Sequence, residues 1–81
     1  MNTREFLTGV KIICQYYNDL DGYHHIPEHD MFCLRKTDRE IGYDEVKKLM
    51  GLGWFQNNPY ETNPETDPEK YDPDEDWYCN A

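Results

Sequence analysis

The sequence predicts a small single domain of the α+β class, and three observations support this prediction. The chain has 81 residues, which suffices for one core and not for two. One segment repeats apolar residues at three- and four-residue steps, as amphipathic helices do, and a second carries the start and stop signals of a short helix. Two short segments rich in aromatic and β-branched residues flank a proline-containing turn, as in a β-hairpin. The expected order is helix, β-hairpin, helix, then an extended aromatic segment and an acidic C-terminal region of proline turns.

The first predicted helix covers Asn2–Leu20. Asn2 and Glu5 have the spacing of a capping box, in which each side chain accepts a hydrogen bond from the other residue's backbone N–H. Gly22 and the acids before it supply the stop and the turn. One apolar face is formed by Phe6, Val10, Ile13, Tyr17 and Leu20.

The hairpin is predicted from Tyr23–Ile26 and Met31–Lys36, with Pro27 early in the turn between them. Side chains two residues apart in a strand point to the same face. Phe32 and Leu34 are therefore the pair expected to face the core.

The second predicted helix covers Ile41–Gly51. Gly42 is expected at the N-cap, and the acids that follow it favour the positive end of the helix dipole. Gly51 is expected in the left-handed position after the last turn, with Leu52 folding back onto the helix. Trp54 and Phe55 follow as the extended segment that closes the core.

Charge divides the chain into a compact body, residues 1–56, and an acidic region, residues 57–81. The body holds nine acids and seven bases, whereas the acidic region holds eight acids and one base, Lys70. Four Asn-Pro or Asp-Pro steps predict a series of turns in the acidic region, because each proline excludes helix at the residue before it. Trp77 and Tyr78 are apolar enough to pack this region back on the body.

Composition narrows the function classes. A net charge of −9 repels nucleic acids and anionic membranes and attracts basic surfaces. No apolar run approaches the roughly 18 residues of a membrane span, and Met1–Leu7 lacks the apolar core of a signal peptide. Three cysteines without close spacing do not form a secreted disulfide framework. The sequence therefore predicts a soluble intracellular protein with reduced thiols.

The residue patterns of the sequence give little support for metal binding or for catalysis. His25, His29 and Cys33 could supply zinc ligands, but Pro27 opposes the helix that would align them, and no paired Cys-x-x-Cys motif is present. The acids around Gly22 do not match a calcium loop at its first position. We find no phosphate-binding glycine loop and no activated nucleophile, so we expect no enzyme, no cofactor and no catalytic residue.

The acids and tyrosines of the C-terminal region are the candidate partner-binding residues. Alternate residues of an extended chain lie on one side about 6.5 Å apart, so carboxylates there could engage arginines and lysines that normally grip phosphates. Tyrosine adds apolar contact area at interfaces. The candidate set is Glu61, Glu65, Asp67, Glu69, Tyr71, Asp72, Asp74, Glu75, Asp76 and Tyr78.

With its small size, its charge and this mixture of acids and tyrosines, the chain resembles the small acidic phage-encoded inhibitors of host defence, in particular anti-CRISPR proteins and other nucleic-acid mimics. The resemblance is to a class that shares no fold or motif. It implies a stoichiometric, noncovalent block of a basic nucleic-acid-binding surface, such as that of a Cas protein or surveillance complex, in the cytoplasm of a bacterial host.

Two alternatives remain open at this point. One is a small interaction or adaptor module that binds partners through Ile26–Lys36 and the second helix, with a passive acidic tail. The other is a small metal-binding domain. Self-association is also open, because a short sheet leaves edges and the body is nearly neutral.

Overall fold

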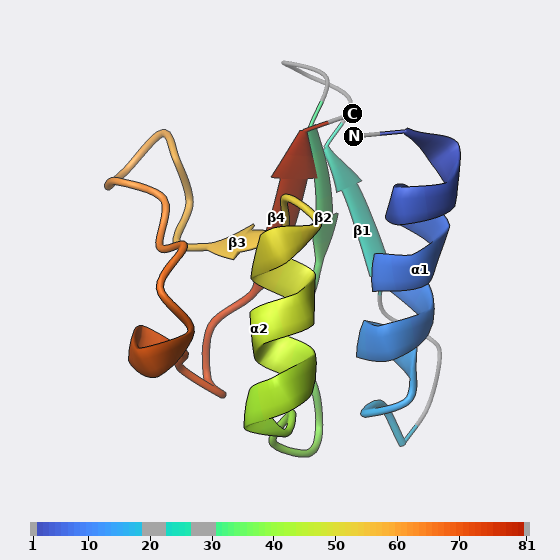
Figure 1. Ribbon diagram of the computed structural model, residues 1–81. Coiled ribbons are helices and arrows are strands. Elements are labelled where there is room, and N and C mark those ends of the chain that lie inside the picture. Colours follow the sequence, from blue (N-terminus) through green and yellow to red (C-terminus); the bar gives the residue numbers. More distant parts are fainter. Residues whose placement is uncertain (1, 19–22, 27–30, 81) are drawn as a thin grey trace.

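The computed structural model describes residues 2–18 and 31–80, and the backbone of residues 23–26. It confirms the α+β class: two helices lie on one face of an antiparallel sheet (Figure 1). The elements in chain order are α1 (Thr3–Cys14), β1 (Tyr23–Ile26), β2 (Met31–Leu34), α2 (Tyr43–Gly51), β3 (Phe55–Gln56), the short 3-10 helix η2 (Pro68–Lys70) and β4 (Trp77–Asn80).

The sheet has four strands in the order β1-β2-β4-β3, so the C-terminal strand lies inside it. All three strand pairs are antiparallel. Tyr78 stands opposite Cys33 on one side and Phe55 on the other, and Trp77 stands opposite Leu34. Trp77 and Tyr78, the residues expected to pack back on the body, are thus part of the centre of the sheet.

Helix α1 begins as predicted and ends earlier. Asn2 and Glu5 form the capping box, with the Glu5 N–H donating to Asn2 Oδ1 at 2.8 Å. The prediction that the helix continues to Leu20 is wrong, because α1 ends at Cys14. Beyond that point the carbonyl of Tyr16 accepts hydrogen bonds from the backbone N–H groups of Asp38 and Arg39, at 3.0 and 3.1 Å. These bonds to a distant loop replace the helical pattern.

Helix α2 begins after Gly42, as predicted, and its C-terminal turn differs from the prediction. Gly51 is still helical, and the left-handed residue is Gly53, with φ of 106°. The Trp54 N–H donates to the Leu49 carbonyl at 3.0 Å, and the Gly53 N–H donates to the Met50 carbonyl at 3.2 Å. This is a Schellman motif placed two residues later than expected, and it turns Trp54 into the core.

The main core lies between the helices and the sheet. Its largest fully buried side chains are Trp54, Trp77, Ile13, Leu34 and Leu49. Leu34 and the partly buried Phe32 face this core, which confirms the predicted inward pair. A second cluster, Met31, Cys33, Phe55 and Tyr78, is also buried. Within the residues that the structure describes, no helix is both long enough and apolar enough to cross a membrane.

The segment after β2 differs from the predicted strand in its last residues. The prediction carries the strand to Lys36, whereas β2 ends at Leu34. The Lys36 N–H donates to Asp76 Oδ1 at 2.8 Å instead of to a neighbouring strand. The chain therefore leaves the sheet at the point where it contacts the acidic region.

Candidate protein-binding surface

The acidic segment, residues 57–76, is anchored at both ends by neighbouring strands. It leaves the sheet after β3 and returns at β4, and these two strands pair through Phe55↔Tyr78 and Gln56↔Trp77. Because the two anchor points are adjacent, the segment is a closed loop rather than a trailing tail. Figure 1 shows it beside β3 and α2, away from α1.

Gln56 connects both halves of the acidic segment to the sheet. Its side chain is 1% exposed; Oε1 accepts from the Asp72 N–H at 2.9 Å, and Nε2 donates to the Asp72 carbonyl at 2.8 Å. Nε2 also lies 3.4 Å from the Glu75 carbonyl. Its backbone exchanges two hydrogen bonds with Glu65, at 3.1 and 2.8 Å. Gln56 thus fixes the backbone at three separated points, two through its buried amide and one through its own backbone.

Side-chain caps fix the turns between these points. Asp67 caps η2 by accepting from the Glu69 N–H at 3.0 Å, and Asp72 accepts from the Asp74 N–H at 2.9 Å. Asn58 accepts from the Tyr60 N–H at 3.0 Å. In each case a short polar side chain bonds to the backbone two residues on, as the Asx-Pro steps lead one to expect. Asp67 and Asp72 therefore have a structural role besides their charge.

Tyr71 fastens the acidic segment to β4 and to the residues just before α2. Its ring stacks on Trp77 with centroids 5.9 Å apart, and its hydroxyl oxygen accepts from the Ile41 N–H at 3.0 Å. The 3-10 helix η2 contacts α2 just before this point in the chain. An apolar anchor and a hydrogen bond thus join the segment to the start of α2.

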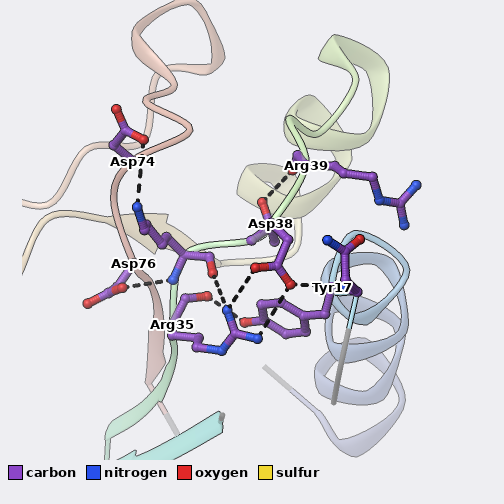
Figure 2. A network of polar contacts seen from close by, with 9 residues as sticks. Tyr17, Arg35, Asp38, Arg39, Asp74 and Asp76 are labelled. Atoms are coloured by element: carbon purple, nitrogen blue, oxygen red, sulfur yellow. Dashed lines mark hydrogen bonds and ion pairs between the residues drawn. The ribbon is translucent and has the colours of Figure 1, made fainter. Parts of the chain in front are cut away.

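Two carboxylates of the segment contact the loop after β2 (Figure 2). Asp76 accepts from the Lys36 N–H, and Asp74 Oδ1 lies 3.9 Å from Lys36 Nζ. The second contact is loose, because the side chains are 57% and 84% exposed, and exposed ion pairs contribute little to stability. In the same loop the Arg35 guanidinium lies 4.4 Å above the ring of Tyr17 and 3.4 Å from Asp38. Lys36 of this loop thus contacts both carboxylates.

The result is an acidic surface on a fixed backbone. Glu65 and Asp76 are half-buried; Glu65 Oε2 accepts from the Asp67 N–H at 3.2 Å. The remaining six acids are exposed, namely Glu61, Asp67, Glu69, Asp72, Asp74 and Glu75. Lys70 is the one base of the segment, so this surface presents a strong net negative charge.

The two tyrosines of the candidate set have interior roles. Tyr78 is 7% exposed and stacks on Phe55 at 6.0 Å, and burial raises the pKa of its phenol to about 12. Tyr71 is half-buried against Trp77. Tyr71 holds the acidic segment to β4, Tyr78 packs within the sheet, and neither side chain is exposed. Tyr60 lies on this surface and its side chain is 56% exposed. Its position in the sequence among the acids is the pattern that could have predicted this exposed aromatic residue.

The three cysteines are free thiols whose pKa values are raised by burial. Cys14, Cys33 and Cys79 are free thiols. Burial raises the pKa of Cys33 to about 11 and that of Cys79 to about 12, and it also raises the pKa of Cys14. A raised pKa leaves less of the thiolate, the nucleophilic form, at neutral pH. For the zinc hypothesis, His29 and the side chain of His25 lie outside the described residues; within those residues no three histidines, cysteines or acids are grouped to hold a metal.

Comparisons with protein-family models, with curated proteins and with solved structures find no match for this chain. The functional reading therefore depends on the geometry and charge described above.

Proposed function

We propose that the protein is a stoichiometric inhibitor that occupies a basic nucleic-acid-binding surface of a larger protein. One observation carries the proposal: six exposed carboxylates stand on a backbone fixed at both ends, by Gln56 and by Asx turns. A fixed array places its charges without the ordering cost that a flexible tail meets on binding. It is therefore suited to replace phosphates on a cationic groove.

The folding of the acidic segment also raises its charge density above that of an extended chain. Fully extended at about 3.1 Å per residue, sixteen residues would spread their charge over about 50 Å, far more thinly than duplex DNA. The loop instead lies within a molecule whose extents are 29 × 27 × 24 Å. Its carboxylates are thus closer to the density that a phosphate-binding groove recognises.

The partner class that we favour is a Cas effector of a bacterial host, blocked by a phage-encoded protein. To test it, purified Cas effectors of the different types are titrated with the protein while the binding of labelled target DNA is followed by fluorescence anisotropy. We expect one effector to lose DNA binding at a stoichiometric ratio, with a block that weakens steeply as salt rises. If every effector retains its DNA, the Cas assignment is wrong.

A charge-removing variant tests the mechanism. Replacing Glu61, Asp67, Glu69, Asp72, Asp74 and Glu75 by their amides removes six of the nine net negative charges. Asn at positions 67 and 72 still accepts the turn hydrogen bonds, so the backbone should stay in place. We expect inhibition to fall about thirty- to a hundredfold if each of the six contacts contributes a few tenths of a kcal/mol. Two double variants with equal charge loss make a smaller matched comparison. One combines Glu69→Gln and Glu75→Gln in the acidic segment. The other combines Glu40→Gln and Asp44→Asn on the exposed surface of the body.

The second candidate is an interaction module that binds through its body. The exposed Tyr43, at 53%, favours it, because exposed aromatics on a helix are common interface anchors. Tyr43→Ala separates the two functions: it should leave binding unchanged for an acidic inhibitor and weaken it for a body-centred module. Partner binding that survives the six amides and is lost with Tyr43→Ala would decide for the module.

A further inference from the structure

We propose that Tyr60 and Glu61 together bind an arginine of the partner, so that the acidic surface selects an arginine-rich groove over a lysine-rich one. This selectivity rests on the proposed function and adds the kind of basic residue that the surface recognises. Tyr60 is 56% exposed, and Glu61, the next residue, is exposed as well. A guanidinium is planar, so it can stack on an aromatic ring while its N–H groups bond to a carboxylate, whereas a lysine ammonium has no such plane.

The turn that carries these two residues has a fixed backbone. The Asn58 carbonyl accepts from the N–H groups of Glu61 and Thr62, both at 3.0 Å, and the Asn58 side chain accepts from the Tyr60 N–H at 3.0 Å. Consecutive Cα atoms are about 3.8 Å apart, so the ring and the carboxylate lie within reach of one guanidinium. Figure 1 shows this part of the acidic segment beyond the end of β3 and away from α1.

The body of the protein holds its own arginines in this way. The Arg35 guanidinium lies 4.4 Å above the ring of Tyr17, and its two terminal nitrogens lie 3.4 and 3.5 Å from the two carboxylate oxygens of Asp38 (Figure 2). The Arg39 guanidinium lies 5.6 Å from the centre of the Tyr16 ring. An arginine held by a tyrosine and a carboxylate is therefore a contact that this chain already forms.

A lysine contact of the same loop is looser. Lys36 Nζ lies 3.9 Å from Asp74 Oδ1, and the two side chains are 57% and 84% exposed. The Arg35 and Asp38 side chains are only 26% and 31% exposed. Water and salt screen the less exposed pair less strongly. A stacked arginine is thus held more closely than the lysine, and Tyr60 offers a ring for stacking on the acidic surface.

Two peptides of equal charge test the preference, hexa-arginine and hexa-lysine. Both carry the same fluorescent label, and their binding to the whole protein is followed by anisotropy at one moderate salt concentration. We expect the arginine peptide to bind more tightly. Tyr60→Leu should lower the ratio of arginine-peptide to lysine-peptide affinity about two- to fivefold, the contribution of one exposed cation–π contact. Tyr60→Phe retains a ring and should retain the ratio.

Tyr43→Leu is the matched control, because Tyr43 is 53% exposed and lies on α2, outside the acidic segment. It should leave the affinity ratio unchanged. NMR of the unaltered protein gives a second measurement, in which the ring protons of Tyr60 should shift further with the arginine peptide than with the lysine peptide. Equal effects of Tyr60→Leu and Tyr43→Leu on the ratio would overturn the proposal, and so would equal shifts with the two peptides.

The same titrations separate this selectivity from the inhibitor function. The six amide substitutions remove charge and retain Tyr60, so they should weaken the binding of both peptides strongly. If both peptides bind with a ratio that Tyr60→Leu does not alter, the arginine selectivity is wrong and inhibition through charge stands. If the wild-type protein binds neither peptide even at low salt, the selectivity and the inhibitor function are both wrong.

Discussion

The body and the acidic segment are stabilised by different forces. In the body, two helices bury large apolar side chains such as Ile13, Leu49 and Trp54 against the sheet. In the acidic segment, residues 57–76, most side chains are exposed, and order comes from Gln56, from Asx turns and from Tyr71. Hydrophobic burial is non-directional, whereas hydrogen bonds fix particular atoms. A loop with little apolar surface can therefore still hold its charges in place.

The largest expected effect comes from crowding the apolar layer at Gly9. A Cβ at this position would lie 1.9 Å from Nε1 of Trp54, which is fully buried, so one of the two must move. Gly9→Ala should lower the free energy of unfolding by about 3 kcal/mol, as strong overpacking does. Chemical denaturation followed by tryptophan fluorescence measures this change.

Gly51→Ala is the matched control for that substitution. Gly51 is helical and a Cβ there meets nothing within 4 Å, so alanine should stabilise the protein by a few tenths of a kcal/mol. If Gly9→Ala and Gly51→Ala have similar effects, the close packing of α1 on Trp54 does not hold.

A substitution at Gln56 tests the polar support of the acidic segment. Gln56→Leu keeps an apolar stem of similar size but leaves the backbone groups of Asp72 without their partner, which should cost about 2 kcal/mol. The rate of amide hydrogen exchange should rise more in residues 65–76 than in α1. Inhibition should fall although the net charge is unchanged.

The control for Gln56→Leu is Gln15→Leu, because Gln15 is exposed at the end of α1. It should change neither exchange nor inhibition. If Gln56→Leu leaves exchange in residues 65–76 unaltered, then turns alone order the acidic segment, and the contrast with the body becomes weaker.

Tyr71→Phe removes one hydrogen bond and retains the aromatic contact. The Ile41 N–H loses its acceptor, while the ring can still stack on Trp77. We expect a loss of about 1 kcal/mol in thermal or chemical unfolding. Tyr43→Phe, at an exposed site, should be neutral. Equal stability of the two variants would show that stacking, and not the hydrogen bond, joins the segment to α2.

The sequence predicted the parts of the fold that depend on local patterns. Asn2 and Glu5, three residues apart, mark the start of α1, and Gly42 marks the start of α2. The exposed acids follow from composition. The end of α1 was not predictable in this way, because it depends on the distant loop at Asp38 that bonds to Tyr16.

Long-range contacts also decide the details of the candidate surface. Gln56 looks like an ordinary polar residue next to Phe55, and only its burial between β4 and the acidic segment shows its role. Tyr78 matched the pattern of an interface tyrosine, but its place in the central strand buries it. Pairing between strands far apart in the chain is not encoded in a local pattern, so these roles required the three-dimensional structure.

The smallest expected effect concerns the contact between the segment after α1 and the loop after β2. The pKa of Asp38 is lowered, first by the hydrogen bond from the Asn18 N–H at 2.7 Å and then by Arg35 (Figure 2). Because the folded-state pKa lies below the ordinary value of 3.8, this stabilisation is present above that value and is lost as the pH falls through the folded-state pKa. Asp38→Asn should therefore be slightly less stable than the wild type at neutral pH.

Denaturation curves of both proteins between pH 7 and strongly acid solution measure this difference. It should shrink to zero at low pH, where the carboxyl group of Asp38 is protonated in the folded and the unfolded state. Raised salt should reduce the part due to Arg35 and leave the part due to the Asn18 N–H, since screening acts on the charge pair. A difference that persists unchanged in acid would mean that residue 38 acts through packing and not through its charge. The loop would then be stabilised by burial, like the body, and not by hydrogen bonds, like the acidic segment.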